Sequence, residues 1–207
     1  MTIPDTPDPV ALFGQIDIYL FDQILRRRLA SGMKVLDAGC GTGRNVAYLL
    51  RAGYDVCGAD EDPAAIAEVR GLAARLAPQL PADNFRVEPV EALSFPDACA
   101  EVVISSAVLH FARDHDHFSR MLGESWRVLA PGGLFFCRLA STIGMPERMR
   151  ELGDGRFLLP DGSERYLVDE RRLMELTARL GGRLADPLKT TVVQDQRCMT
   201  TWVMRKA

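Results

Sequence analysis

The stretch from Val35 to Asn45, which reads VLDAGCGTGRN, constrains the fold of this chain more than any other. It predicts a short apolar strand ending near Asp37, a turn in which Gly39, Gly41 and Gly43 alternate with other residues, and then a helix. Glycine lets the backbone turn tightly and lets a ligand approach with no Cβ in the way. A helix N-terminus adds unpaired N–H groups and the positive end of a dipole. The stretch therefore predicts a nucleotide-like ligand held by the backbone.

The length and composition suit one soluble domain. We expect a single domain over residues 1–207, with a flexible lead-in over 1–12 and a variable insertion on the substrate side over 141–168. The net charge of −3 and the dispersed arginines give no electrostatic footprint for nucleic acid. Neither a signal peptide nor a membrane span is expected. Five widely spaced cysteines without a C-x-x-C pair favour reduced thiols in the cytoplasm.

Apolar patterning predicts strands and helices in alternation after a first amphipathic helix over 13–29. The expected strands are 33–38, 55–59, 84–88, 102–104 and 134–139, and the expected helices are 44–52, 62–76 and 114–129. This order favours a parallel sheet with helices on both faces, which binds ligands beyond the carboxyl ends of its strands. A further helix over 169–180 and two extended runs, 183–193 and 197–205, predict an antiparallel pair at the end.

The identity of the nucleotide depends on two charged residues in the opening stretch. A dinucleotide fingerprint, G-x-G-x-x-G/A, needs a small residue where this chain has Arg44. Asp37 would repel a pyrophosphate, whereas an acid at this place suits a ligand that carries positive charge. A nicotinamide-dependent oxidoreductase is therefore disfavoured, although it shares the strand, turn and helix.

Four motifs in order resemble those of the class I, seven-stranded S-adenosylmethionine-dependent methyltransferases. They are VLDAGCGTGRN (35–45), GADEDP (58–63), LSFPD with VVIS (93–97 and 102–105), and WRVLAPGG (126–133). The resemblance is firm to residue 139 and looser to residue 207. It implies a three-layer α/β/α sandwich whose mostly parallel seven-stranded sheet has an antiparallel final strand, with an added N-terminal helix.

The resemblance also implies a cofactor site for S-adenosylmethionine, with S-adenosylhomocysteine as product. Asp37 would accept from the ammonium group and Asp60 from both ribose hydroxyls, because one carboxylate accepts two hydrogen bonds. Glu61 would flank the adenine or face water. Many relatives carry an acid at the Val90 position, so the adenine contact here would use Glu91 or backbone N–H groups. The implied set is Tyr19, Asp37, Gly39, Cys40, Gly41, Gly43, Asn45, Asp60, Glu61, Val90, Glu91, Ala92 and Ser105.

Several side chains outside that set have two interpretations. His110 would be a general base if the acceptor must lose a proton, or a structural histidine packed between its neighbours. The run from Asp114 to His117 is expected to be the first turn of a helix rather than a metal site, because i and i+2 positions do not share a helix face. Tyr19 and Phe21 would cover the cofactor or fill the core. Five side chains of the insertion would line an acceptor pocket or form a solvated surface. These are Arg148, Arg150, Arg156, Arg165 and Tyr166.

The predicted function is methyl transfer to a small-molecule acceptor through an O, N, S or C nucleophile, without nucleic acid or membrane partners. A binder of S-adenosylmethionine that acts as a sensor or partner subunit is the alternative. No motif identifies the acceptor or separates a monomer from a homodimer.

Overall fold

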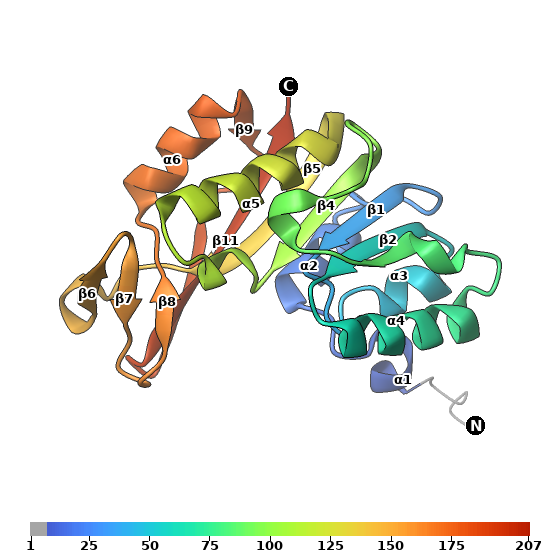
Figure 1. The fold of residues 1–207 in the computed structure, drawn as a ribbon, viewed down its shortest axis with the longest axis horizontal. Coiled ribbons are helices and arrows are strands. Elements are labelled where there is room, and N and C mark those ends of the chain that lie inside the picture. Colours follow the sequence, from blue (N-terminus) through green and yellow to red (C-terminus); the bar gives the residue numbers. More distant parts are fainter. Residues whose placement is uncertain (1–7) are drawn as a thin grey trace, which may run out of the picture.

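The computed structural model describes residues 8–207, apart from the side chain of Pro146. A central sheet lies between two groups of helices, and a small second sheet projects from one end (Figure 1). The helices are α1 (Pro9–Phe13), α2 (Ile18–Leu25), α3 (Ala47–Arg51), α4 (Pro63–Leu76), α5 (His115–Val128) and α6 (Glu170–Arg179). The strands of the central sheet are β1 (Lys34–Ala38), β2 (Asp55–Asp60), β3 (Phe85–Val87), β4 (Ala100–Ser106), β5 (Leu129–Ala140), β9 (Gly182–Leu184), β10 (Lys189–Val193) and β11 (Arg197–Lys206). The second sheet holds β6 (Arg150–Gly153), β7 (Arg156–Leu158) and β8 (Glu164–Tyr166).

The central sheet has the strand order β10-β11-β5-β4-β1-β2-β3. The strands from β1 to β5 pair in parallel, whereas β11 is antiparallel to β5 and pairs with β10 as an antiparallel hairpin. This confirms the predicted mostly parallel sheet with an antiparallel final strand. The short strand β9 also pairs with β11, so the sheet has eight strands rather than the seven expected.

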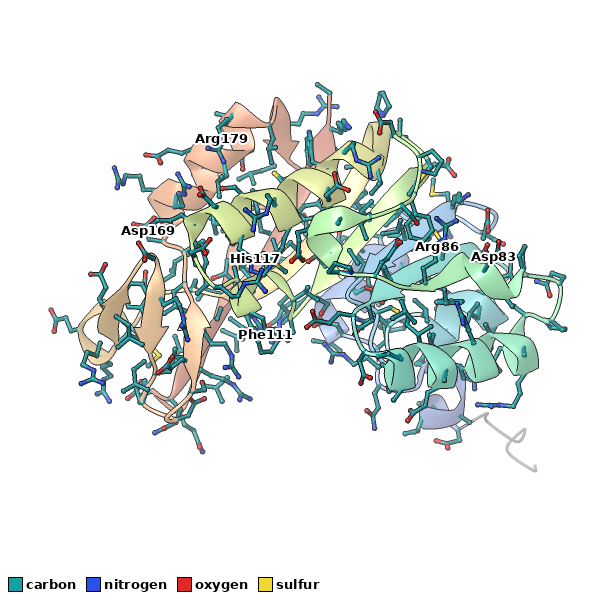
Figure 2. The ribbon with its side chains drawn as sticks, viewed as in Figure 1. Asp83, Arg86, Phe111, His117, Asp169 and Arg179 are labelled. Carbon is teal, nitrogen blue, oxygen red and sulfur yellow. The ribbon has the colours of Figure 1, made fainter. Side chains whose placement is uncertain are left out.

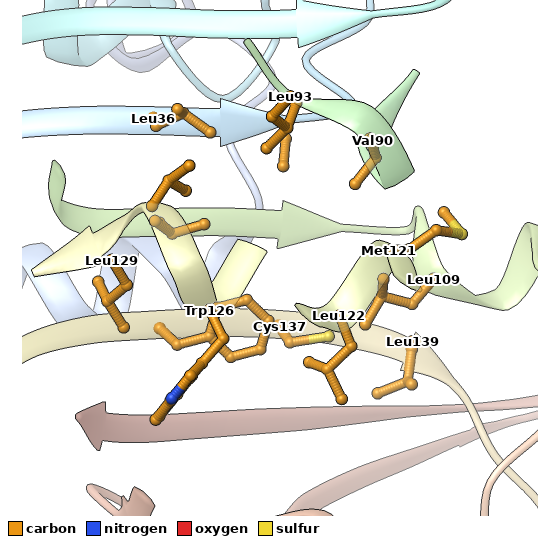
Figure 3. Packing of buried hydrophobic residues seen from close by; sticks show 14 of the residues in the cluster. Leu36, Val90, Leu93, Leu109, Met121, Leu122, Trp126, Leu129, Cys137 and Leu139 are labelled. Atoms are coloured by element: carbon orange, nitrogen blue, oxygen red, sulfur yellow. The ribbon is translucent and has the colours of Figure 1, made fainter. Parts of the chain in front are cut away.

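Alternate side chains of the parallel strands pack into two apolar layers, one on each face of the sheet. Leu36 and Val103 belong to the layer that also holds Trp126 and Leu122 of α5 and Leu173 of α6. Figure 3 shows Leu36 beside Leu93 in this layer. The preceding residue of each strand packs toward α2, α3 and α4 on the other face. The fold is therefore the three-layer α/β/α sandwich predicted, and it leaves the carboxyl ends of the strands to form a site.

The N-terminal prediction is wrong in detail. The predicted helix over 13–29 is shorter in the structure: α1 ends at Phe13, because Gly14 takes a left-handed φ of +63°, and α2 runs only from Ile18 to Leu25, with Asp17 accepting from the N–H of Tyr19 at its start. The predicted lead-in falls partly on residues 1–7, which lie outside the described residues. Its remainder includes α1, which Asp8 caps and which ends on Phe13, packed 4.7 Å from the Phe21 ring.

The insertion contains secondary structure that its sequence did not predict. Its second sheet is an antiparallel meander, β6-β7-β8, that begins in largely exposed charged residues. Strands of three or four residues leave no alternating apolar pattern to detect. Tyr166 fixes the meander to α5: its ring stacks on Phe118 at 4.6 Å, and its hydroxyl lies 2.8 Å from Nδ1 of His115. Within residues 8–207, no helix combines the length and apolar character required to cross a bilayer.

Candidate functional site

A cavity of about 530 Å³ opens at the carboxyl ends of β1, β2 and β4. We call it the larger cavity. Its walls come from the turn after β1, the end of β2, the segment after β3, the turn after β4 and the start of α5. Figure 2 labels two of its residues, Phe111 and His117, near the centre of the molecule. The lining residues are Gly39, Asp60, Glu61, Pro89, Val90, Glu91, Ala107, Val108, Phe111, Arg113, His117 and Met121.

The glycine turn meets the larger cavity at Gly39. All three glycines of the turn have left-handed φ values, but only Gly39 lines the cavity. A Cβ on Gly39 would lie 2.4 Å from a methyl carbon of Val108, so no other residue fits there. A Cβ on Gly43 would instead meet Val69 of α4 at 2.7 Å, so Gly43 serves packing. Cys40 is buried, and its N–H donates to the Ala59 carbonyl.

Asp60 lies at the end of β2 with its carboxylate held in place from both sides. Oδ2 accepts from the N–H of Gly41 at 2.9 Å, and Oδ1 accepts from the N–H of Asp62 at 3.0 Å. Each oxygen retains a lone pair for a further donor. Asp62 caps α4 by accepting from Ala64, as predicted, so Asp60 is free of the capping role. Asp60 thus offers two oriented acceptors to a ligand in the cavity.

Asp37 is buried without a hydrogen-bond partner on either carboxylate oxygen within the described chain, and its side chain is 1% exposed. Burial, against the lowering effect of Arg44 and with a smaller contribution from Asp60, raises the pKa of Asp37 to about 8. An ionised carboxylate here requires a cation beside it. The prediction that Asp37 meets a positively charged group agrees with this deficit.

The far end of the larger cavity, beyond β3, differs from what the sequence suggested. The N–H of Ala92 donates to the Pro89 carbonyl, so it is already used. An oxygen of Glu91 lies 2.9 Å from Nε2 of His117 and 3.5 Å from Arg113. Burial opposes ionisation of Glu91, but its own N–H, His117 and Arg113 hold its pKa below the usual range. Val90 is buried and lines the wall beside Glu91, whose N–H already serves its own carboxylate.

A buried aspartate of the N-terminal segment, Asp17, joins the glycine turn to the sheet. Its N–H donates to Oδ1 of Asn45 at 3.0 Å, and its Oδ2 accepts from Ser106 at 3.2 Å and from Arg138 at 3.1 Å. The predicted residue Asn45 therefore acts on the N-terminal segment rather than on the cavity. The sequence places Asp17 inside the predicted helix over 13–29 and does not show this role, because three of its partners lie 28 to 121 residues away.

A second cavity of about 280 Å³, the smaller cavity, adjoins the first. Ala107 lines both cavities in a left-handed conformation, with φ of +64°. The 3₁₀ turn η3 (Leu109–Phe111) that follows presents His110 to the smaller cavity and Phe111 to the larger one. The residues lining the smaller cavity are Arg44, Ala107, His110, Arg138, Ala140, Leu159, Asp161, Ser163, Arg165, Val193, Arg197 and Met199.

His110 is a neutral, buried imidazole. Its Nδ1 accepts from the N–H of Ala140 at 3.1 Å, so the hydrogen-bond network assigns the ring proton to Nε2. Burial, with Arg165 and Arg138 nearby, lowers the pKa of His110 to about 4. The free nitrogen therefore already carries a proton, and this geometry argues against the predicted base role. His110 is instead placed to donate a hydrogen bond.

Three other predicted positions do not line the larger cavity. Tyr19 lies in α2, where its hydroxyl is 2.6 Å from Oγ1 of Thr191 and its ring lies under the Arg138 guanidinium. Ser105 is completely buried in β4, opposite Cys137 of β5. Asp114 caps α5 by accepting from the N–H of His117, as predicted for a helix first turn. No group of three potential metal ligands occurs among residues 8–207.

The sheet order and the glycine turn after β1 define a Rossmann-like methyltransferase fold, and comparisons with known proteins agree. A family described as "Methyltransferase domain" matches residues 36–137, about half of the chain. The Malonyl-[acyl-carrier protein] O-methyltransferase of Pectobacterium atrosepticum is 34% identical over 111 residues, which cover 53% of this chain and 40% of that relative. In this match the chain spans less than half the relative's length.

Two solved structures share the fold at low sequence identity. A methyltransferase from Methanosarcina mazei superposes with a TM-score of 0.72 at 24% identity, over 88% of this chain and 96% of that one. A 1,6-didemethyltoxoflavin-N1-methyltransferase from Burkholderia thailandensis gives 0.70 at 22% identity, over 97% and 81%. The chain belongs to the class I S-adenosylmethionine-dependent methyltransferases, an enzyme family whose cofactor is S-adenosylmethionine.

Proposed function

We propose that this chain binds S-adenosylmethionine in the larger cavity and transfers its methyl group to a small-molecule acceptor in the smaller cavity. One observation carries the proposal: a continuous cavity runs from Gly39 past Asp60 to Glu91, beside the unpartnered carboxylate of Asp37. The cofactor fits these residues because it has an ammonium group for Asp37 and a ribose diol for Asp60. The Burkholderia relative was crystallised with S-adenosylhomocysteine, which supports the same ligand class here.

Several residues of the larger cavity have a proposed binding role. Gly39 lets the ligand approach the backbone, and Asp60 accepts from two hydroxyl groups while Gly41 and Asp62 orient it. Val90 and the Glu91 backbone flank the base, with Met121 on the opposite element. Asp17 positions the N-terminal segment against the glycine turn through Asn45.

The chemistry that the cofactor supplies is an electrophilic methyl group on a sulfonium, and its product is the neutral thioether S-adenosylhomocysteine. The protein aligns the acceptor and excludes water, which can contribute ~7–11 kcal/mol. Ala107, which lines both cavities, marks where the acceptor meets the donor. A base is needed only if the acceptor must lose a proton.

We further propose a cytoplasmic location. All five cysteines are free, and four of them are buried. Unpaired thiols in this number are typical of a reducing compartment.

Calorimetric titration tests the function directly. Both S-adenosylmethionine and S-adenosylhomocysteine should bind, and NAD should not. Asp60→Ala should weaken binding by ~1–3 kcal/mol, because it removes hydrogen bonds to a charged group. Glu61→Ala, at an exposed neighbouring position of the same wall, serves as the matched control and should change affinity far less. Tight NAD binding, or equal affinities for the wild type and Asp60→Ala, would contradict the proposal.

A turnover assay then separates an enzyme from a sensor. S-adenosylhomocysteine production is measured against a panel of small thiols, amines, phenols and carboxylic acids. Production above the rate without acceptor supports the enzyme. Binding without turnover across the panel favours a sensor or partner subunit.

A further inference from the structure

We propose that the acceptor carries a carboxylate group, and that Arg165 and Arg197 hold it in the smaller cavity. This inference rests on the proposed function, because it identifies the substrate class for the same site. It is argued from the charge, the hydrogen-bond donors and the size of the smaller cavity.

The smaller cavity concentrates positive charge in a protein of net charge −3. Four arginines line it, against one acid, Asp161. Arg138 is neutralised by Asp17 at 3.1 Å. The other three arginines form no salt bridge with any carboxylate of residues 8–207. Asp161 lies close enough for Arg197 and Arg165 to lower the pKa of its carboxyl, but one carboxylate balances only one of these three arginines. The remaining positive charge favours an anion, and a carboxylate matches the paired donors of a guanidinium.

Other arginines of the insertion do form salt bridges, and this contrast makes the unpaired arginines informative. Arg148 pairs with Asp195 at 3.4 Å, and Arg156 pairs with Glu164. Both of these arginines lie outside the smaller cavity. Arg165 of β8, on the neighbouring strand, has no such acid, and its guanidinium instead lies 4.8 Å above the ring of Phe111. Phe111 lines the larger cavity and Arg165 lines the smaller one, so this contact places the guanidinium at the boundary between the two cavities.

Among the unpaired arginines, Arg165 and Arg197 are placed to hold the acceptor. They come from β8 of the insertion and from the start of β11, and neither belongs to the glycine turn. Arg44 belongs to that turn and donates to Ser106 at 3.3 Å, so it lies nearer the proposed cofactor. His110 adds a neutral donor, because Ala140 already uses its Nδ1.

The remaining walls favour a small acceptor with an apolar body. Asp161 accepts from both the N–H and the hydroxyl of Ser163, and Ser163, Arg197 and Arg165 hold the pKa of its carboxyl below the usual range. Leu159, Val193 and Met199 supply apolar surface for the body of the acceptor. A volume of about 280 Å³ lies just below the range of drug-sized ligand pockets.

The experiment compares matched ligands on protein saturated with S-adenosylhomocysteine. Benzoate, salicylate and phenylacetate are each titrated beside their carboxamides, and phenyl phosphate is included as the dianion. Saturation-transfer NMR reports binding. We expect at least one carboxylate to bind ~10-fold more tightly than its amide, the ratio expected for a charge-assisted hydrogen bond. Phenyl phosphate should bind more weakly than that carboxylate.

The variant Arg165→Gln with Arg197→Gln should abolish this preference while leaving the affinity for S-adenosylhomocysteine unchanged. Arg150→Gln, an exposed arginine of β6 outside both cavities, is the matched control and should keep the preference. Stabilisation of each variant by S-adenosylhomocysteine in thermal melts verifies the fold.

The two proposals fail in different ways. Absence of S-adenosylhomocysteine binding by the wild type would contradict the proposed function. If S-adenosylhomocysteine binds normally, any of three results overturns the acceptor inference alone. These are the absence of a carboxylate preference in every pair, a preference that survives in the double variant, and tighter binding of phenyl phosphate.

Discussion

The larger cavity begins at backbone atoms of the glycine turn, whereas the smaller cavity is closed by side chains from separate parts of the chain. Gly39, Asp60 and the segment at Val90 follow one another along the βα units of a single sheet edge. The smaller cavity needs Arg44, His110, the insertion and the hairpin of β10 and β11 together. Only Ala107 lines both.

This difference in construction matches a difference in task. A ligand common to a whole family can be held by a backbone turn, which tolerates many surrounding side chains. An acceptor that differs between relatives has to be recognised by side chains on segments that can vary without disturbing the sheet. The two cavities should therefore respond differently to substitution, and four variants test this.

The largest effect is expected at Gly39, where the backbone approach is tightest. In Gly39→Ala the new Cβ would lie 2.4 Å from Val108, at φ of +82°, so steric overlap and backbone strain add. We expect a loss of ~3 kcal/mol in unfolding free energy, with cofactor affinity reduced as well. Chemical denaturation and calorimetry measure the two quantities.

Gly41→Ala provides the matched control for crowding. Gly41 also has a left-handed φ, +51°, but nothing lies within 4 Å of its added Cβ. Only backbone strain destabilises this variant, so we expect a loss of ~1 kcal/mol in unfolding free energy. Equal losses in both variants would show that the contact with Val108 does not define the larger cavity.

The comparison also explains how much the sequence predicted. Asp60, Gly39 and the caps Asp62 and Asp114 were found because each acts within its own strand, turn or helix. Their chemistry depends on neighbours a few residues away, and the sheet order then follows from the alternation of elements. The parallel sheet and its antiparallel final strand were predictable for the same reason.

What the sequence did not predict depends on distant contacts. Asp17 falls inside the predicted first helix, yet its side chain reaches Ser106 and Arg138. Arg197 lies in an ordinary strand pattern, and only the folding of the insertion beside it makes it part of a cavity. Glu91 was considered for adenine, but His117, from a helix 26 residues later, lies against its carboxylate.

A smaller effect is expected at Asp37, where the larger cavity depends on a side chain rather than on backbone. Asp37→Asn removes the buried acid, and we expect ~2 kcal/mol weaker binding of S-adenosylmethionine. In the ligand-free protein the same substitution should instead increase folding stability at neutral pH, because it removes a buried acid. The unfolded chain releases this proton near pH ~4, whereas burial keeps it bound in the folded chain up to about 8.

Folding stability of the wild type should therefore decline, through this group, as pH rises between these values, and Asp37→Asn should remove that decline. Two charged neighbours influence the pKa of Asp37 in the folded chain: Arg44 lowers it and Asp60 raises it. Thermal melts of both proteins from pH 5 to 8, with and without S-adenosylhomocysteine, provide the measurement. If the variant bound the cofactor as tightly as the wild type, the ammonium contact would be excluded.

The smallest effect is expected at His110, in the smaller cavity. Its pKa of about 4 means that the ring stays neutral from pH 5.5 to 8. A donor role predicts that His110→Gln, which keeps an N–H donor, retains kcat within ~10-fold and leaves the pH profile unchanged in this range. A general base contributes ~100-fold or more and would give a limb near its pKa. The steady-state pH profile of S-adenosylhomocysteine production separates the two roles. A loss of a hundredfold or more, with a limb between pH 6 and 7 that vanishes in the variant, would restore the base role.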